Sequence, residues 1–585
     1  MFRRLRGKKV IEKYLKCLNN IVILNVVKVL KDCNKILRMN AESLRMTQIN
    51  MNKRIVISVL LFITLISFSL TVINFRIPSP PSFNADEAAF GYNAYSLLKT
   101  GRDEYGTLLP LRLKSFGDYK MPLYSYLSVP FMAVMGLSET SARALNVFLS
   151  LLFPLIVYLL TKELFKKDSY ALVAAFISST SLGLHIVARH AHEAYLAAFL
   201  TTLTFYLLVR FLKKQTVAKG ALLAASLLLM LFSYHPGRLF AGLFLVAAGI
   251  YAVQQKKVKR YIPAFLLVII VIGVFTISDF IYKPERLKNL LFFSSAGIQL
   301  KVQELKTEGG IRYLYNPLLV GIREMTFEHL SYFSPQFLLQ NGDSNDRFGY
   351  KGMGLITPIE YILFFAGLYF IIRKKEEWNY VFLFVLLLSP LSASLSWSTS
   401  SLTRSLFLLV PISILAGYGA VNIGNNLKKN LTSYLFIGLI ICSFLYFSLT
   451  QWDFYLFHYP KRLITIHAWQ GGYAEVNKYI KDNYDSTSRF YVTRDIGMPY
   501  IFTLFYQQYP PEKYQKEAHL SAADEYGFGQ VEKFDKFVFE FRNPELLKEG
   551  EVLIGTRDNF KGLGKEYNPI MISPQGEPMF GIYRK

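Results

Sequence analysis

Repeated long apolar runs constrain this chain more than any other feature of its sequence. Each run approaches the ~20 residues that an α-helix needs to cross the hydrocarbon core of a bilayer. The composition agrees, since 52% of the residues are hydrophobic and only 18% are charged. We therefore predict a mainly α, polytopic membrane protein. About eleven transmembrane helices are expected, over residues 55–75, 145–164, 170–187, 194–212, 217–233, 239–254, 261–282, 355–372, 379–397, 405–421 and 432–450.

Basic residues in the short connections predict how these helices are oriented. Lys and Arg near the ends of membrane spans favour the cytoplasmic side. Alternate connections carry them, and the short connections in between lack lysine. The pattern predicts a cytoplasmic amino end and an extracytoplasmic region after residue 450, in the cytoplasmic membrane. The basic connections contain Lys53 and Arg54; Lys162, Lys166 and Lys167; Lys213 and Lys214; Lys256, Lys257, Lys259 and Arg260; Arg373, Lys374 and Lys375; and Lys428 and Lys429.

The net charge of +25 is largely explained by this topology signal. A strongly basic chain could bind nucleic acid, but here the cations follow the membrane connections, so we predict no nucleic-acid partner. The three cysteines, Cys17, Cys33 and Cys442, include no pair in a long loop. Neither a disulfide framework nor a cysteine metal site is expected from them.

The pattern divides the chain into three regions. Residues 1–50 are basic, with a modestly amphipathic run over 10–37. They represent either a helix lying on anionic lipid or an extension ahead of a true start at residue 51. Residues 51–450 form the membrane domain. Residues 451–585 alternate a helix-like run, 473–481, with strand-like runs at 489–493, 552–556 and 579–583. This alternation predicts a small extracytoplasmic α/β or α+β domain.

The first outer loop, residues 76–140, holds the strongest candidate for a chemical site. It begins with the adjacent acids Asp86 and Glu87 and later contains Asp118 and Lys120, amid aromatic residues. Glycines and prolines divide it into short helices joined by turns. Carboxylates and a lysine gathered at a membrane surface favour chemistry over packing. The structural alternatives are N-capping of a helix after Asn84 for the two acids, and snorkelling to the interface for Lys120.

Further polar residues lie in the other outer connections, and each also has a structural interpretation. The cluster at 185–193 could form a local hydrogen-bonded cap, the turn at 233–238 could be ordered by its histidine, and the arginine at 404 could anchor a helix. Its outer location nevertheless runs against the usual bias of basic residues. Because all of these groups fall on one predicted side of the membrane, together they favour a functional site. The residues are Arg189, His190, His192, Glu193, His235, Arg238 and Arg404.

The first outer loop and its surroundings resemble a known family. The segments DEAAFGYNAYSLLKTG, GDYKMPLYSYLSVPFMAVMG and SETSARALN occur in that order after the first span, and SPQFLLQNGD and a Thr-Arg pair follow later. This order is similar to that of membrane glycosyltransferases of the GT-C architecture, in the branch of the protein O-mannosyltransferases and the lipid A aminoarabinose transferase. The resemblance covers about residues 55–450 and is most specific in the first loop.

The resemblance implies transfer of a hexose or pentose from a polyprenyl-phosphate donor to an acceptor hydroxyl, with inversion at the anomeric carbon. The acceptor would be a protein, a lipid or a cell-envelope glycan. Asp86 is the better candidate for the general base, with Glu87 beside it. Lys120, Arg404 and Arg238 would meet the charge of the lipid phosphate. The residues implied in acceptor or sugar binding are Glu193, His190, His192, His235 and Asp118.

Two further questions stay open at the level of sequence. Histidines and acids could hold a divalent cation, but no spacing requires one, so we predict no metal ligand and no certain cofactor. A polytopic transporter or lipid flippase, or a non-catalytic envelope-assembly protein, would also have many spans and outer polar groups. Transporters tend to place ionisable residues near the middle of the bilayer and to contain repeats. Neither feature is evident here, which favours the enzyme.

Overall fold

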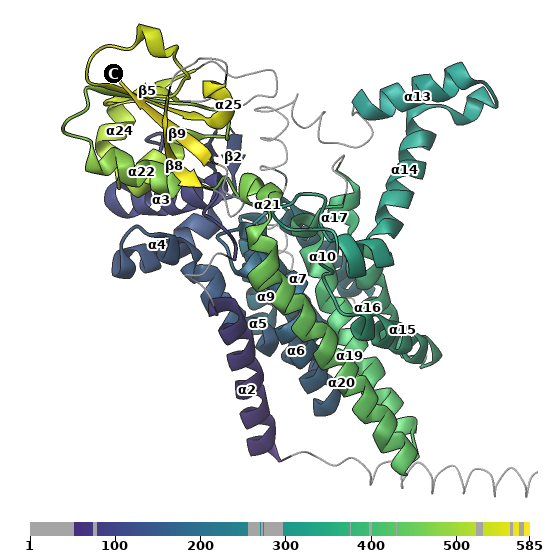
Figure 1. Ribbon diagram of the computed structural model, residues 1–585. Coiled ribbons are helices and arrows are strands. Elements are labelled where there is room, and N and C mark those ends of the chain that lie inside the picture. The colour runs from purple at the N-terminus through teal and green to yellow at the C-terminus, as the bar shows by residue number, and fades with distance from the viewer. Residues whose placement is uncertain are drawn as a thin grey trace, which may run out of the picture. The chain divides into compact units, whose positions relative to one another are not determined.

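The computed structural model describes most of the chain after residue 51 (Figure 1). It divides into two compact units, residues 1–58 and 59–585, and the account below concerns the second unit unless stated. The amino-terminal region 1–50 and nearly all of the predicted span 261–282 lie outside the described residues. The residues that the structure describes are 52–73, 79–116, 118–254, 269–270, 273, 296–374, 376–396, 400–428, 430–521, 531–561, 566–572 and 578–585.

Apolar helices make up the membrane domain, and each predicted span apart from 261–282 overlaps one or more of them. By length and composition, five of the described helical segments can cross a membrane, or six if the bent pair α6–α7 counts as one span. The total of eleven stays a prediction. The helices are α2 (Lys53–Val72, shared by the two units), α5 (Glu139–Phe165), α6 (Asp168–Thr180), α7 (Leu182–Ala188), α8 (Glu193–Lys213), α9 (Val217–Leu231), α10 (His235–Gln254), α15 (Pro358–Arg373), α16 (Glu377–Leu388), α17 (Leu391–Ser394), α18 (Leu402–Ser405), η5 (Leu406–Leu408), α19 (Leu409–Asn426) and α20 (Leu431–Asp453).

Small residues bring some of these helices very close together. A Cβ atom on Gly367 of α15 would lie 2.0 Å from the carbonyl oxygen of Leu415 in α19, and one on Gly419 would lie 2.2 Å from that of Leu363. Only glycine permits such an approach, as is common between helices in membranes. The two helices therefore form a tight pair.

The first outer loop folds into two helices joined by a hairpin. Helix α3 (Ala85–Thr100) leads through a turn region to the strands β1 (Leu113–Ser115) and β2 (Asp118–Lys120), and helix α4 (Leu123–Met135) follows. The strands are antiparallel, with Leu113 opposite Lys120. Short helices in this loop were predicted. The hairpin sets Lys120 at the end of β2, facing back towards α3.

The described stretch before α15, from residue 296, adds further elements that the sequence had not indicated. It contains α13 (Ala296–Glu308), the 3-10 turn η3 (Arg312–Leu314), α14 (Pro317–Ser331) and the π-helical turn η4 (Gln336–Asn341). Glu328 of α14 accepts a hydrogen bond from the backbone of Ser400, at 2.9 Å. This contact ties the base of α14 to the segment that enters α18.

The carboxy-terminal region is a mixed sheet with helices, as the alternating runs predicted. Among the described residues the strand order is β4-β5-β6-β3-β7-β9-β8, with β3 parallel to β6 and β7 and the other pairs antiparallel. The three predicted strands are β3, β7 and β9, and the predicted helix is α22. The elements are η6 (Phe454–His458), η7 (Tyr459–Lys461), α21 (Leu463–Ala468), α22 (Tyr473–Asp482), β3 (Arg489–Val492), α23 (Pro499–Tyr506), α24 (Pro511–Glu517), β4 (His519–Leu520), β5 (Val531–Phe534), β6 (Phe537–Val538), η8 (Pro544–Leu546), β7 (Glu551–Thr556), α25 (Arg557–Phe560), β8 (Asn568–Ile572) and β9 (Pro578–Arg584).

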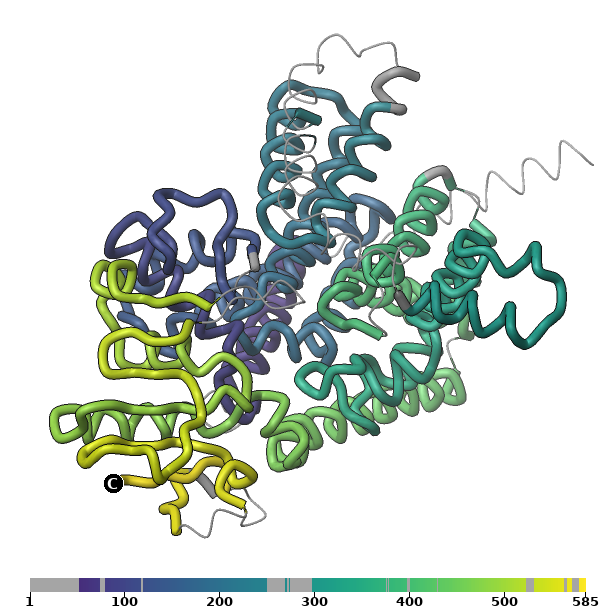
Figure 2. Tube along the Cα trace, turned by 90° about the horizontal axis from the view of Figure 1, so that it is seen from above, coloured from purple at the N-terminus to yellow at the C-terminus, as the bar shows by residue number. Residues whose placement is uncertain are grey.

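This sheet domain lies against the first outer loop. Helix α23 packs on α3, and both views show the yellow-green carboxy-terminal elements beside the purple-blue loop (Figures 1 and 2). The Tyr500 hydroxyl donates to the buried carboxyl of Glu104, at 3.0 Å. Residues far apart in the sequence therefore share one packed region along α3 and the turn that follows it.

Candidate active site

The start of α3 is fixed by a capping box. The Asn84 side-chain oxygen accepts hydrogen bonds from the N–H groups of Asp86 and Glu87, at 2.9 and 3.2 Å. In return, Glu87 accepts one from the N–H of Asn84, at 3.2 Å. These bonds satisfy orphan donors of the first turn. The capping alternative thus holds for Asn84 and Glu87, and it leaves the Asp86 carboxylate available to other partners.

Asp86 is held between two cations from distant parts of the chain. One carboxylate oxygen lies 2.8 Å from Lys120 Nζ, and the other lies 3.1 Å from Arg347 Nη1. Partial burial would raise the pKa of Asp86, but Lys120 and then Arg347 outweigh it and hold that pKa well below its usual range. The Asp86 side chain is 37% exposed. It is therefore an accessible, firmly ionised carboxylate.

Lys120 is positioned by aromatic rings as well as by Asp86. Its ammonium group lies 4.7 Å from the ring centres of both Phe90, on α3, and Phe116, in the β1–β2 turn. Such cation–π contacts stabilise an ammonium that has lost much of its water. Only 14% of the Lys120 side chain is exposed. The snorkelling alternative does not describe this arrangement.

Arg347 was not among the residues proposed from the sequence. It lies a few residues after the SPQFLLQNGD segment, in a loop shaped by Asp343. The Asp343 carboxylate accepts from the N–H of Asn345 at 2.8 Å and from that of Leu402 at 2.6 Å. One buried carboxyl thus joins the Arg347 loop to the helix that carries Arg404. No local signal in the sequence singles out Arg347, because the stretch before α15 carries several other lysines and arginines.

Glu87 has a different environment from Asp86. It is fully buried and forms a two-pronged ion pair with Arg143 of α5, with Nε–Oε1 and Nη2–Oε2 distances of 2.7 and 2.8 Å. Its Oε1 also accepts from the N–H of Ala191, at 2.8 Å. Both oxygens are thus occupied away from any opening. We therefore propose a structural role for Glu87 and keep Asp86 alone as the candidate base.

The two histidines before α8 are neutral and of opposite tautomer. Burial lowers the pKa of both His190 and His192 to about 3. His190 Nδ1 bonds to the carbonyl of Ile186 at 2.8 Å and must donate, which leaves Nε2 as an acceptor. His192 Nδ1 accepts from the N–H of Ala194 at 3.0 Å, which places its proton on Nε2. The pair offers one acceptor and one donor.

Two of the nearby polar atoms are buried without a hydrogen-bond partner in the described part of the chain. They are His190 Nε2 and Glu193 Oε2. Such groups are costly unless something satisfies them, so they favour a bound hydroxyl group. Arg189, by contrast, is buried and donates to the carbonyls of Leu70, Thr71 and Ser79. It connects the end of α2 to the following segment, rather than forming a local cap.

The remaining candidates lie near the starts of α10 and α18 and, for Asp118, on β2. Arg404 donates to Ser396 at 2.8 Å and lines a small crevice with Tyr234. The Nη2 atom of Arg238 lies 2.9 Å from the Sδ atom of Met121, and Met121 is the residue after Lys120. His235 begins α10, beside the Tyr234 ring. The structure places Asp118 at the start of β2, opposite Ser115.

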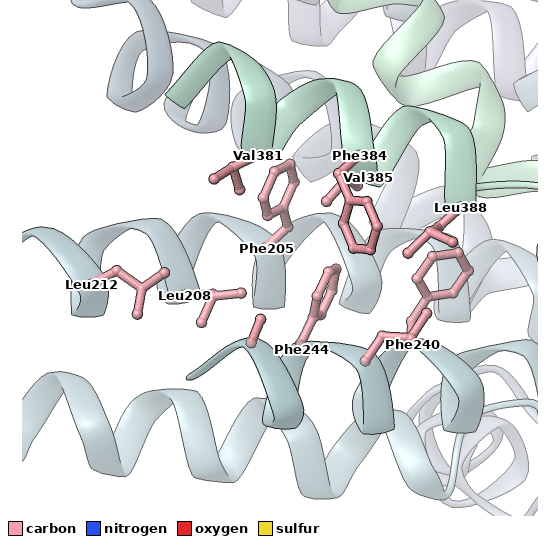
Figure 3. Close-up of a pocket in the computed structure, with 11 residues that line it drawn as sticks. Phe205, Leu208, Leu212, Phe240, Phe244, Val381, Phe384, Val385 and Leu388 are labelled. Carbon is pink, nitrogen blue, oxygen red and sulfur yellow. The ribbon is translucent and has the colours of Figure 1, made fainter. Parts of the chain in front are cut away.

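An apolar cavity of about 300 Å³ opens among three helices of the membrane domain (Figure 3). Phe240 lines both this cavity and the crevice of Arg404. The apolar space therefore approaches a cationic group at one end. Its lining comes from α8 (Phe205, Leu208 and Leu212), α10 (Phe240, Leu243, Phe244 and Ala247) and α16 (Val381, Phe384, Val385 and Leu388).

No group of three or more His, Cys, Asp or Glu side chains is arranged to hold a metal ion within the described ranges. The ion pairs Asp86–Lys120 and Asp86–Arg347 occupy the carboxylate that would be the most accessible ligand. The arrangement provides a carboxylate, several cations and neutral imidazoles. This set of groups suits proton transfer and binding of an anion.

Comparison with known proteins agrees with this architecture. A family model described as dolichyl-phosphate-mannose-protein mannosyltransferase matches residues 119–278. No curated protein sequence matches the chain significantly. The structure is similar to that of ArnT from Cupriavidus metallidurans in the apo state, with a TM-score of 0.51 and 11% identity, over 90% of this chain and 97% of ArnT.

The archaeal oligosaccharyltransferase AglB from Archaeoglobus fulgidus aligns less well, with a TM-score of 0.47 and 14% identity. The alignment covers 78% of this chain and 64% of AglB, so the chain spans less than two thirds of that protein. The resemblance to GT-C membrane glycosyltransferases of the protein O-mannosyltransferase type is confirmed, in sequence over residues 119–278 and in fold over most of the chain.

Proposed function

We propose that this protein transfers a sugar from a polyprenyl-phosphate carrier to the hydroxyl group of an acceptor, at the outer face of the cytoplasmic membrane. The match to a family named for a dolichyl-phosphate-mannose donor supports this donor class. The observation that carries the proposal is the accessible Asp86 carboxylate, held by Lys120 and Arg347. Transfer from a phosphate carrier needs a carboxylate base and cations for the leaving group.

The donor lipid would occupy two connected environments. Part of its isoprenoid chain lies in the apolar cavity of Figure 3, among α8, α10 and α16. Its phosphate lies at the cationic end, where Arg404 lines the adjoining crevice and Lys120 and Arg347 lie at Asp86. Arginine offers a planar fork to phosphate oxygens, and lysine offers a point charge.

The chemistry is a single displacement with inversion. The acceptor oxygen attacks the anomeric carbon while Asp86 takes its proton. The bond between the anomeric carbon and the phosphate oxygen breaks, and its electron pair stays with the lipid phosphate. The sugar passes through an oxocarbenium-like state, which the Asp86 carboxylate stabilises. The products are the glycosylated acceptor and the free polyprenyl phosphate.

The donor itself makes Asp86 a stronger base. With both cations at hand, the pKa of Asp86 lies well below its usual range, which makes the carboxylate a weak proton acceptor. A bound lipid phosphate competes with Asp86 for Lys120 and Arg347. When these cations pair with the phosphate, the pKa of Asp86 rises from its lowered value, and Asp86 accepts a proton more readily. The acceptor is therefore activated only when a donor is present.

The neutral histidines and Glu193 orient the reacting hydroxyl groups. His190 Nε2 is an acceptor without a partner among the described residues, and His192 carries its proton on Nε2. Buried polar atoms of this kind discriminate strongly for a ligand that satisfies them. We assign them to the sugar or the acceptor hydroxyls.

The proposed orientation has a direct test. In a variant without the native cysteines, a cysteine in place of Tyr313, whose side chain is 91% exposed, should react with an impermeant maleimide in intact cells. A cysteine in place of the exposed Asn426 should react only after solubilisation. The opposite pattern would invert the proposed topology.

The function is tested with purified protein in vesicles that carry no ion gradient. The donors are dolichyl-phosphate mannose and other extracted polyprenyl-phosphate sugars, each supplied together with protein, lipid and cell-envelope glycan fractions as hydroxyl acceptors, with mass detection of free carrier and glycosylated products. We expect carrier release with the wild type and about 10²- to 10⁴-fold less with Asp86→Asn, because that change removes the base. Movement of intact glycolipid without bond cleavage would identify a flippase instead.

A further inference from the structure

The segment that leads into the carboxy-terminal sheet contacts the loop of Arg347. The hydroxyl of the fully buried Tyr459 donates to the carbonyl oxygens of Asp346 and Arg347, at 2.8 and 2.9 Å. Trp469 Nε1 donates to the same hydroxyl oxygen, at 2.8 Å. Because Trp469 uses an acceptor position of the hydroxyl, its single hydrogen is directed to the two carbonyls.

The same segment also contacts the start of α3. Gln470 Oε1 accepts a hydrogen bond from the N–H of Ala85, at 2.8 Å. Ser82 donates to the carbonyl of Trp469, at 2.6 Å. The Ala85 N–H is one of the donors that a helix start leaves unsatisfied, and Asn84 caps only the two that follow. Gln470 thus completes the cap of the turn that carries Asp86.

The backbone conformation of Gln470 indicates that its surroundings fix this residue in place. Its φ angle is +56°, a left-handed conformation that few residues other than glycine adopt. Its side-chain amide also contacts the carbonyl of Ile496 within the carboxy-terminal region, at 3.4 Å. Strained conformations of this kind persist where the surroundings fix them.

We propose that residues 459–470 position the two halves of the active site, setting the Asp86 carboxylate against the Arg347 guanidinium. Tyr459 acts on the Arg347 loop, and Gln470 acts on the first turn of α3. The carboxy-terminal region thereby contributes positioning residues to the active site. This inference rests on the proposed transferase function, in which the ion pair must form and then yield to the donor phosphate.

The test compares two buried tyrosines that each lose one hydroxyl. Tyr459→Phe removes the bonds to the Arg347 loop. Tyr473→Phe is the control for loss of a buried hydroxyl in the carboxy-terminal region. Its hydroxyl donates to the carbonyl of Ile496, at 3.0 Å, and that carbonyl keeps its contact with Gln470 Nε2 in the variant. We expect about a tenfold loss in kcat for Tyr459→Phe, as for one well-placed hydrogen bond. The control should retain full kcat. Tyr459→Phe should lower the melting midpoint more than the control does, because it loses three hydrogen bonds and leaves the buried Trp469 Nε1 without its acceptor.

A double substitution separates positioning from general destabilisation. Because Tyr459 acts through Arg347, adding Tyr459→Phe to Arg347→Ala should reduce kcat no further. Independent sites would multiply their losses. A multiplicative loss, or an equal loss of kcat in Tyr473→Phe, would overturn the positioning role.

Hydrogen exchange gives a measurement that does not depend on turnover. Tyr459→Phe should speed amide exchange in the peptide that spans residues 341–350, relative to the wild type and to Tyr473→Phe. If the wild type transfers no sugar from any carrier, the proposed function fails while this measurement still reports on the contact. Unchanged exchange in Tyr459→Phe would refute the contact itself.

Discussion

Replacing Glu87 with glutamine tests which of the two adjacent acids is catalytic. The Glu87 carboxylate is fully buried and the Arg143 side chain is 5% exposed, so neither charge is compensated by water. Glutamine presents one oxygen and one amide group in place of two anionic oxygens. One of the two charge-assisted bonds to Arg143 is therefore lost and the other is weakened.

The expected cost follows from these contacts. Hydrogen bonds to charged groups contribute about 1.5–3 kcal/mol each, and breaking a buried ion pair by removing one partner costs about 3–5 kcal/mol. The free energy lost with one such bond, together with part of the second, falls within the range for breaking a buried ion pair. We expect Glu87→Gln to lower the free energy of unfolding by about 3–5 kcal/mol. Asp86→Asn should have a much smaller effect, because solvent screens its partly exposed ion pairs.

Thermal unfolding of purified protein in one fixed detergent gives the comparison, with midpoints read for the wild type and both variants. The double variant Glu87→Gln with Arg143→Met should recover most of the midpoint, because it removes the buried charge that has lost its anionic partner Glu87. A Glu87→Gln protein with an unchanged midpoint and no transfer activity would refute this reasoning. It would place the catalytic base at Glu87.

The remaining predictions concern chemistry and pH. Asp86→Asn should reduce kcat by about 10²- to 10⁴-fold while lowering the melting midpoint much less than Glu87→Gln does, and full turnover would remove Asp86 as the base. Lys120→Ala and Arg404→Ala should each weaken donor use about ten- to a hundredfold at saturating acceptor, and Arg404→Lys should rescue only in part. Unchanged dependence on donor concentration would leave both residues as structural groups. Burial raises the pKa of Glu104 to about 8, so the folded protein keeps a proton that the unfolded chain has lost. Glu104 therefore contributes a fall in stability as pH rises from about 4.5 to about 8, after which its contribution levels off; the lowered pKa values of His190 and His192 contribute a rise between about 3 and about 6.5. Glu104→Gln should flatten that fall in unfolding midpoints measured across this range, and an unaltered slope would contradict the neutral carboxyl.

Local patterns in the sequence predicted the parts of the fold that depend on local physics. An apolar run of sufficient length forms a membrane helix largely regardless of its neighbours, which is why the predicted spans other than 261–282 overlap described helices. The carboxy-terminal strands at 489–493, 552–556 and 579–583 were found because apolar, β-branched and aromatic residues mark buried strands. Helices α13 and α14 were missed because their sequences contain neither a continuous apolar run nor a clear apolar face.

The long-range contacts of the candidate site could not be predicted from local patterns. Asp86 and Lys120 lie in one loop, and their pairing is compatible with a short hairpin. Arg347 is 261 residues away from Asp86, and no local pattern links them. Glu87 and Arg143 are likewise joined only by the packing of α3 against α5. Adjacent acids look equivalent in a sequence, and only the fold separates an exposed carboxylate from a buried one.

The contacts of Tyr459 and Gln470 also have a consequence for how the chain is made. During synthesis the amino-terminal regions emerge and insert first, so Asp86, Lys120 and Arg347 reach the membrane before the residues that hold them in place. Until residues 459–470 have emerged, the inserted helices carry the reacting groups without their supports. A nascent or prematurely terminated chain would thus sit among lipid-linked sugars without consuming them. If the proposed function is correct, transfer therefore begins only after residues 459–470 have reached the Arg347 loop and the start of α3.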